Sequence, residues 1–203
     1  KNEYNKAKPY LVKDNSCTIV IYNTFKPVLN DYQKVLVKLI DDYDSYTLKI
    51  PYSKPLNNVF WSYTGNRVEK FLNDFDSGFK GFNQYHKNML TSLENKTNNF
   101  MNNGNFFTGK LKIQDKERDI VSCVVDFNPN EIAELVLKKY EGDIAILLNL
   151  KARTVYFRKR KRCDVSMAKL AEKLCNGGGH DDAAGGSLNE TIINITKLLE
   201  QKQ

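Results

Sequence analysis

Two different periodicities of hydrophobic and polar residues divide the chain near Gly104. Before that residue, apolar side chains recur at intervals of three and four, which is typical of amphipathic helices. This spacing predicts helices at about 28–40, 57–73 and 84–103, the last of them polar and closed by Gly104 as its C-terminal cap. The short β-branched run TIVIY at 18–22 predicts a buried strand.

After this point strands and helices alternate. Apolar or alternating runs predict four strands, of which the last two form a hairpin, at 106–113, 119–127, 144–150 and 154–158. Asn128-Pro129 marks the start of a helix, because asparagine is a favoured N-cap and proline fits the first helical position. Further helices are predicted at about 164–175 and 191–202. This alternation is typical of a mixed α/β domain.

The fold class that these patterns predict is α/β, in two lobes. Residues 1–84 are expected to be mostly helical, 85–104 to form a connector helix, and 105–203 to form a domain with a mixed sheet. The chain begins at Lys1 and not at methionine, so we expect it to be part of a longer product or a trimmed one.

Composition narrows the class of partner. The 203 residues include 31 basic and 24 acidic side chains, and the net charge of +7 favours polyanions such as nucleotides, nucleic acid or anionic surfaces. A basic soluble surface without an anionic ligand remains the alternative. No stretch approaches the roughly eighteen apolar residues of a membrane helix, so no membrane span is predicted. The four cysteines are far apart in the sequence, which predicts reduced thiols and a cytoplasmic location.

The densest basic segments are 151–153 and 158–162, which read KAR and RKRKR. One interpretation is a track for a nucleic-acid backbone, with Tyr156 and Phe157 as stacking faces. The other is a charged edge strand that discourages pairing with further strands. The aromatic residues of the first lobe, in contrast, are expected in the core and not at bases: Phe75, Phe79 and Phe82.

The glycine-rich segment after the helix at 164–175 is the most informative part of the chain. Gly177, Gly178 and Gly179 are followed directly by His180. Successive amides without side chains can form a concave nest that holds an anion such as phosphate, and the imidazole can donate a hydrogen bond to the same anion. The alternative is a flexible linker or a cap turn. A linker, however, has no need of the fixed small residues at 183–185.

The sequence of residues 177–185, GGGHDDAAG, resembles the G-G-G-H-x-x-A-A-G signature of the DHH-associated domain of DHH phosphoesterases. The approach to it is similar as well, because a strand that carries Arg158 leads into a helix and then into the glycines. The resemblance covers about Phe106 to Leu199. Asn176 stands where the family commonly has a fourth glycine, and asparagine tolerates left-handed backbone better than most residues.

This resemblance implies a phosphoesterase that uses two divalent metal ions, usually manganese, held mainly by an N-terminal DHH domain. The glycine-histidine loop then binds a phosphate or terminal nucleotide of the substrate. By this implication Gly177, Gly178, Gly179 and His180 are substrate-binding residues, and Arg158 is a phosphate partner. A guanidinium suits that role, because its donors match phosphate oxygens in pairs.

The acidic segment 41–44 is similar to the end of the N-terminal domain in the oligoribonuclease-like branch of the family. Clustered carboxylates are what hard divalent cations require. The resemblance favours Asp44, then Asp41, as a metal ligand. The alternative is a solvated helix end.

A complete catalytic site is not expected in this chain, because no D-x-D pair followed by an Asp-His-His triplet is present. We therefore expect the C-terminal part of a metal-dependent phosphoesterase, a mostly helical remnant of the DHH domain followed by the DHH-associated domain. The implied partners are a short oligonucleotide, single-stranded nucleic acid or cyclic dinucleotide, and an N-terminal DHH half in the same or a separate chain; a homodimer is left open. The alternatives are a non-catalytic nucleic-acid-binding or structural module, and the related tRNA-binding domain of alanyl-tRNA synthetases.

Overall fold

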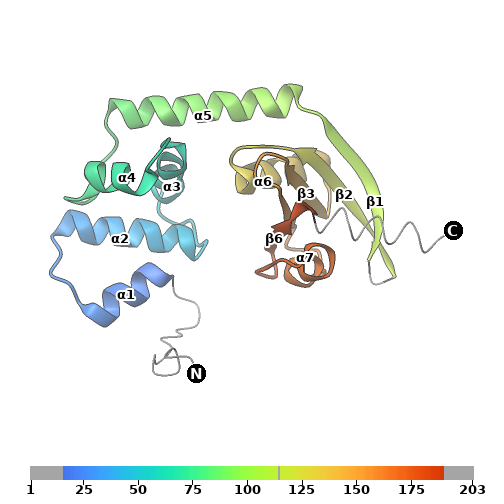
Figure 1. Cartoon of the computed structure of the whole chain (residues 1–203), viewed down its shortest axis with the longest axis horizontal. Coiled ribbons are helices and arrows are strands. Elements are labelled where there is room, and N and C mark those ends of the chain that lie inside the picture. The colour runs from blue at the N-terminus through green and yellow to red at the C-terminus, as the bar shows by residue number, and fades with distance from the viewer. Residues whose placement is uncertain (1–15, 114, 190–203) are drawn as a thin grey trace. The chain divides into compact units, whose positions relative to one another are not determined.

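The computed structural model describes residues 16–113 and 115–189 (Figure 1). The chain divides into two compact units, of which unit 1 ends at Asn95 and unit 2 begins at Lys96. The boundary lies within helix α5 (Gln84–Asn103), which has the predicted bounds. Gly104 follows this helix and its N–H donates to the carbonyl oxygen of Phe100 at 2.8 Å, as expected of a terminating glycine.

Among its described residues, unit 1 has helices and no strands. Besides the first part of α5 it contains α1 (Cys17–Phe25), α2 (Asp31–Asp44), α3 (Ser53–Ser62) and α4 (Arg67–Phe75). Helix α2 begins later than predicted, because Asn30 and Gln33 form a reciprocal capping box that fixes its start. The single helix predicted at 57–73 is two helices, since the chain turns at Gly65, whose φ is +73°.

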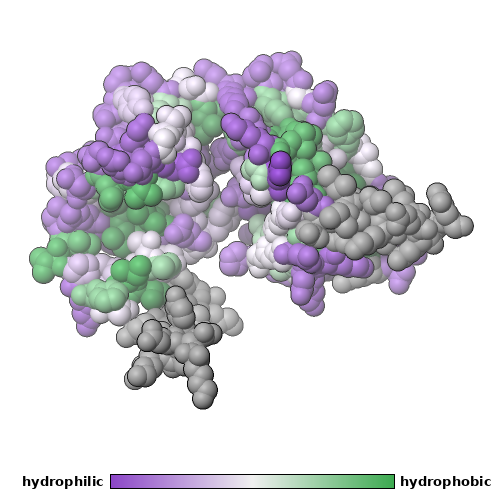
Figure 2. Space-filling view, in the orientation of Figure 1, coloured by the Kyte–Doolittle hydropathy of each residue, from purple (hydrophilic) through white to green (hydrophobic). Residues whose placement is uncertain are grey.

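The strand predicted at 18–22 is wrong, because these residues lie in α1. Ser16 starts the helix, and its Oγ accepts a hydrogen bond from the backbone N–H of Ile19 at 3.2 Å. No residue of α1 is buried, and Phe25 is 75% exposed. Figure 2 shows apolar surface over this helix. A β-branched run forms a strand only where a neighbouring strand is available, and the described residues of unit 1 contain none.

Aromatic rings fill much of the core of unit 1. The predicted core residues Phe75 and Phe79 are buried, and Phe82 packs against them, which confirms that prediction. The other buried members come from α2, α3 and the residue that caps the end of α3: Leu39, Leu56, Val59 and Tyr63.

Unit 2 is built on a six-stranded mixed sheet with the order β1-β2-β3-β4-β6-β5. Strands β2 and β3 are parallel and all other neighbours are antiparallel. The four predicted strands and the hairpin are confirmed as β1 (Phe106–Ile113), β2 (Lys116–Val124), β3 (Ile144–Asn149) and β4 (Thr154–Lys159). The sequence did not predict β5 (Gly178–Gly179) and β6 (Ala183–Ser187).

Two helices cover opposite faces of this sheet, so the predicted α/β fold class is confirmed. Val121, Cys123, Ala145 and Leu147 pack with α6 (Pro129–Tyr140). Residues of the other face, including Ile144, Val155 and Phe157, pack with α7 (Met167–Cys175).

The ends of these helices differ in detail from the prediction. Asn128 does not cap α6 by accepting from its backbone; its Nδ2 donates to Glu131 Oε2 at 2.5 Å instead. Helix α7 begins after Ser166, which caps it, and not at Asp164. The helix predicted at 191–202 lies outside the described residues.

Two further predictions concern the whole chain. The cysteines are free thiols, and three of them are buried: Cys123, Cys163 and Cys175. Burial raises the pKa of the Cys123 thiol to about 11. No helix within the described ranges combines the length and the apolar character needed to cross a membrane.

Candidate functional site

One face of the sheet is left partly uncovered at the glycine-rich end. Helix α6 packs on β2, β3 and β4, whereas α7 packs on β4, β5 and β6 from the other side. Within the described part of unit 2, no helix covers the α6 side of β5 and β6. All five residues of β6 are accordingly half-buried. We call this α6-side surface of β5, β6 and the adjoining His180 the open face.

Strand register decides which side chains lie on the open face. Residues paired directly across an antiparallel ladder share a face. Tyr156 packs against the core on the α6 side and pairs with Gly185, which pairs with Gly178. Because side chains alternate along a strand, Ala183 and Ser187 lie on the same face as Gly185. The floor of the open face therefore consists of small residues.

Most of the glycines in this segment are required by packing. A Cβ on Gly177 would lie 2.1 Å from the Gly185 oxygen, and one on Gly186 would lie 2.4 Å from Cys175 Sγ. Gly179 has a φ of +149° and its Cβ would lie 2.6 Å from the Ala183 oxygen. Gly178 is different, because a Cβ there would have no neighbour within 4 Å among the described residues. Packing among these residues therefore gives no reason for a glycine at position 178.

The backbone amides of the segment are only partly available to a ligand. Gly177 N–H donates to the Ala171 oxygen at 3.1 Å, and His180 N–H donates to the Ala183 oxygen at 2.7 Å. Alternate residues of an antiparallel strand direct their amides to opposite sides. Gly179, one residue before His180, therefore directs its N–H away from β6. The predicted nest of three free amides is thus corrected, since the amide of Gly177 is used to close α7.

The loop that carries His180 is anchored to the sheet, and the residue itself is exposed. The backbone N–H groups of Lys159 and Met167 donate to the oxygens of Asp182 and Asp181, at 3.1 and 2.9 Å. Lys159 also forms ion pairs with both carboxylates. Burial alone would lower the pKa of Lys159, but these two carboxylates raise it. The lysine therefore stays charged and offsets one of the two negative charges beside His180.

Arg158 lies on the same face as His180. It pairs with Ala183, which accepts the hydrogen bond from His180 N–H, so the two side chains stand two strand spacings apart, about 10 Å. The guanidinium is held by α6, because Arg158 Nη2 donates to Glu134 Oε1 at 2.8 Å. The structure thus brings Arg158 and His180 to one face, and the role of Arg158 as a phosphate partner stays a prediction.

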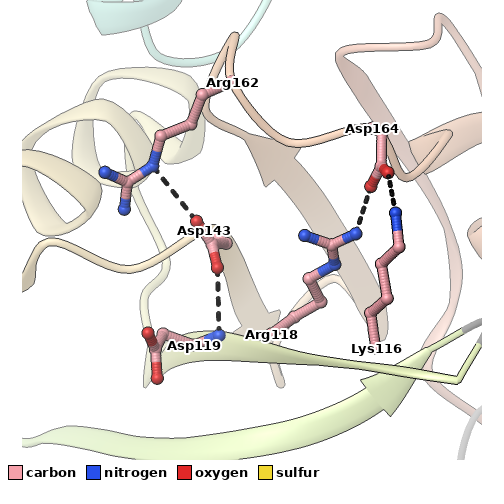
Figure 3. Close-up of polar contacts among 6 residues, drawn as sticks. All are labelled: Lys116, Arg118, Asp119, Asp143, Arg162 and Asp164. Atoms are coloured by element: carbon pink, nitrogen blue, oxygen red, sulfur yellow. Dashed lines mark hydrogen bonds and ion pairs between the residues drawn. The ribbon is translucent and has the colours of Figure 1, made fainter.

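The basic segment 158–162 is largely neutralised within unit 2. Arg160 donates to the Leu137 oxygen, and Arg162 Nε lies 3.2 Å from Asp143 Oδ1 (Figure 3). Lys116 and Arg118 of β2 share Asp164 in the same region (Figure 3). These contacts therefore do not support a continuous nucleic-acid-binding track along 158–162. The charged-edge interpretation is wrong as well, because β4 lies between β3 and β6.

The sheet of unit 2 and its glycine loop are similar to a known domain. Residues 119–202 match the DHHA1 domain. This confirms the predicted DHH-associated domain for that part of the chain, which includes the open face. The oligoribonuclease-like branch stays a prediction. No curated protein matches the chain significantly.

Three solved structures are similar to the chain at low sequence identity. A pGpG-specific phosphodiesterase, PggH, from Vibrio cholerae has 12% identity and a TM-score of 0.49, with 90% of this chain and 71% of that chain covered. An uncharacterized protein from Helicobacter pylori G27 has 16% identity and a TM-score of 0.33, with coverages of 93% and 66%. An exopolyphosphatase-related protein from Bacteroides fragilis has 15% identity and a TM-score of 0.36, with coverages of 68% and 44%. The chain thus spans less than two thirds of the Helicobacter and Bacteroides proteins.

Outside the DHHA1 domain, the acidic segment 41–44 ends α2. The carboxylate of Asp42 is buried and bound by its own loop, so it is not available to a metal. Asp41 Oδ1 accepts a hydrogen bond from Ser16 Oγ at 2.6 Å. Burial, and then the charge of Asp41, raise the pKa of Asp44.

These residues do not make a metal site by themselves. Within 16–113 and 115–189, no group of three or more histidine, cysteine, aspartate or glutamate side chains could hold a metal ion. Asp44 and Asp41 as metal ligands therefore stay a prediction that depends on residues beyond the described ones.

Sequence reasoning missed a partly buried polar cluster around His86. The side chain of His86 is 3% exposed, and its Nε2 lies 2.9 Å from Asp74 Oδ2 and 3.0 Å from the Tyr63 hydroxyl. Tyr63 also donates to Asp74 Oδ2 at 2.5 Å. The members of this cluster, Tyr63, Asp74 and His86, are separated by 11 and 12 residues along the chain, so no local sequence pattern predicts the cluster.

Acid is expected to weaken unit 1 through Asp74. Hydrogen bonds from Tyr63 and then His86 lower the pKa of Asp74. The stability that this carboxylate contributes is present above its unfolded pKa, about 3.9, and is lost as the pH falls through the folded value. Urea unfolding followed by the fluorescence of Trp61, the single tryptophan, should therefore lose more stability between about pH 5 and pH 3 in the wild type than in Asp74→Asn. Equal pH slopes in the two proteins would contradict this assignment.

Proposed function

We propose that this chain is the C-terminal portion of a DHH-family metal-dependent phosphoesterase, and that its open face binds a phosphate of a short oligonucleotide or cyclic dinucleotide. The observation that carries the proposal is Gly178. The described residues leave room for a side chain at position 178 of the open face, yet the signature has a glycine there. A ligand that approaches the backbone closely explains the absence of a side chain.

Two groups next to Gly178 in the chain suit a phosphate. Gly179 directs its N–H away from β6, and His180 is exposed and can donate from its imidazole, while Lys159 offsets one of the two negative charges of Asp181 and Asp182. In the proposed enzyme these groups bind and orient the phosphate. The metal ions, with manganese expected, would be held mainly by residues outside this chain.

An N-terminal half is the proposed partner that completes the enzyme. Exposed apolar residues over α1 support a partner there, because contiguous apolar surface commonly marks an interaction site. Phe25 is 75% exposed, and Ile21 and Val28 beside it are 51% and 102% exposed.

Phosphate binding can be tested on the full 203-residue chain by nuclear magnetic resonance titration with 5′-phosphorylated diadenylate. We expect the amide signals of Gly178, Gly179 and His180 to shift. Loss of one charge-assisted hydrogen bond corresponds to about tenfold in affinity, so His180→Ala should weaken binding by about that factor. Gly178→Val should weaken it at least as much, because its side chain fills the ligand's place while meeting no protein atom.

Gly109→Val is the matched control for Gly178→Val. Gly109 also lies in an exposed strand position, and its Cβ would meet only Ile120, at 3.9 Å. This variant should bind diadenylate as the wild type does. Equal affinity of the wild type, Gly178→Val and His180→Ala would remove the open face from substrate binding. Cleavage of short RNA in the presence of manganese is then measured on a longer product that includes the N-terminal half. An enzyme would cleave the RNA, whereas a non-catalytic module would bind it without cleavage.

A further inference from the structure

Two cations at the turn between β3 and β4 have no part in the site described above. Lys151 and Arg153 are both exposed. Within the described ranges, neither side chain forms a hydrogen bond or an ion pair. The neighbouring segment 158–162 is different, because Arg158, Lys159 and Arg162 pair with carboxylates. The charge at the turn is therefore available to an anion from solution.

This turn is fixed to the end of β6. The backbone N–H of Leu188 donates to the Arg153 oxygen at 2.9 Å. Inside the turn, the N–H of Ala152 donates to Oδ1 of the buried Asn149 at 2.8 Å. The two cations thus stand on ordered backbone, and a ligand need not order the turn when it binds.

Strand β6 leads from the glycine-histidine loop to this turn. Ala183, next to the loop, pairs with Arg158, and Ser187, at the other end, pairs with Thr154, the residue after Arg153. Four residues of extended strand span roughly 13 Å. Along this line the open face carries only Ala183, Gly185 and Ser187, so no large side chain separates its two ends. A single nucleotide is too short to reach both ends, whereas a chain of nucleotides is not.

We infer that Lys151 and Arg153 form a second phosphate subsite, which binds the backbone of an oligonucleotide whose first phosphate lies at His180. The inference rests on the proposed function. Lysine supplies a compact charge and arginine a planar fork that matches phosphate oxygens. The subsite favours longer substrates, because a mononucleotide contacts only the His180 end.

The test compares the full chain with Lys151→Ala/Arg153→Ala. Binding of a fluorescein-labelled, 5′-phosphorylated penta-adenylate is measured by fluorescence anisotropy at several salt concentrations. We expect about tenfold weaker binding of the variant. The slope of log affinity against log salt should fall by about 1.4, because each single-strand phosphate contact contributes about 0.7. The amide shifts that AMP produces at Gly178 and His180 should be unchanged.

A control removes the same charge elsewhere in unit 2. Lys112→Ala/Lys173→Ala acts on β1 and α7 and should leave both ligands within about twofold of the wild type. Unchanged affinity and salt slope for penta-adenylate in Lys151→Ala/Arg153→Ala would overturn the second subsite, while AMP shifts at Gly178 and His180 keep the proposed function. Equal losses for AMP and penta-adenylate would also overturn it, since the cations would then act at one site. Binding of neither ligand by the wild type would defeat the proposed function and the subsite with it.

Discussion

Gly177→Ala is expected to destabilise the sheet of unit 2 by about 3 kcal/mol or more, although it adds a single methyl group. The added Cβ would lie 2.1 Å from the Gly185 oxygen and 2.8 Å from Gly186 Cα. Both atoms belong to the backbone of β6, which is hydrogen-bonded to β4 and cannot move away cheaply. Amide hydrogen exchange of β4 residues such as Val155 and Phe157 measures the loss.

Gly178→Ala is the matched control, one residue further along the chain. Its Cβ meets nothing within 4 Å in the part of the chain that the structure describes, so we expect a change in stability below about 1 kcal/mol. The same variant should weaken diadenylate binding if the open face is the phosphate site. Similar exchange rates in Gly177→Ala and Gly178→Ala would show that β5 and β6 are not packed as described. The pair thus separates a glycine kept for packing from one kept for a ligand.

The sequence identified the domain family of this segment but not its two strands. The GGGH signature indicated a site for an anion, and the DHHA1 match supports that family assignment. Strands β5 and β6 were missed because glycine and alanine have low strand propensity. Their position in the sheet is set by pairing of β6 with β4, a strand that precedes α7 in the chain. Gly177, Gly178 and Gly179 have different roles because of that pairing. The spacing of residues in the sequence therefore does not predict which glycine has which role.

Errors elsewhere have the same physical origin. Residues 18–22 have high strand propensity, but they lie in a helix because no described strand of unit 1 is there to pair with them. The run of cations at 158–162 indicated a nucleic-acid track. Its partners, such as Glu134 and Asp181, are more than twenty residues away in the sequence. The local hydrophobic pattern predicted the positions of most helices and strands in unit 2. The partners of the charged side chains could be identified only from the three-dimensional structure.

The acidic segment 41–44 shows why one aspartate cannot be told from its neighbours by sequence. The carboxylate of Asp42 accepts hydrogen bonds from the backbone of Lys49 and Ile50, both at 3.0 Å, and from Ser53 Oγ at 2.5 Å. Thr47 donates to it as well. Burial alone would raise the pKa of Asp42, but these hydrogen bonds lower it well below its usual range. Asp42 therefore holds the chain between α2 and α3 together.

Asp42→Ala should consequently destabilise unit 1 by about 3–5 kcal/mol, because several buried donors lose their acceptor at once. The control is Asp41→Ala, whose carboxylate accepts only from Ser16 among the contacts described, and which should cost about 1 kcal/mol. Urea unfolding followed by Trp61 fluorescence measures both, since the tryptophan lies in α3 of unit 1. Comparable losses in the two variants would mean that Asp42 is not the organising residue. The wild type should also lose stability in acid, as the pH falls from about 3.9 toward the lowered pKa of Asp42, and Asp42→Ala, which keeps only the contribution of Asp74, should lose less over the same range.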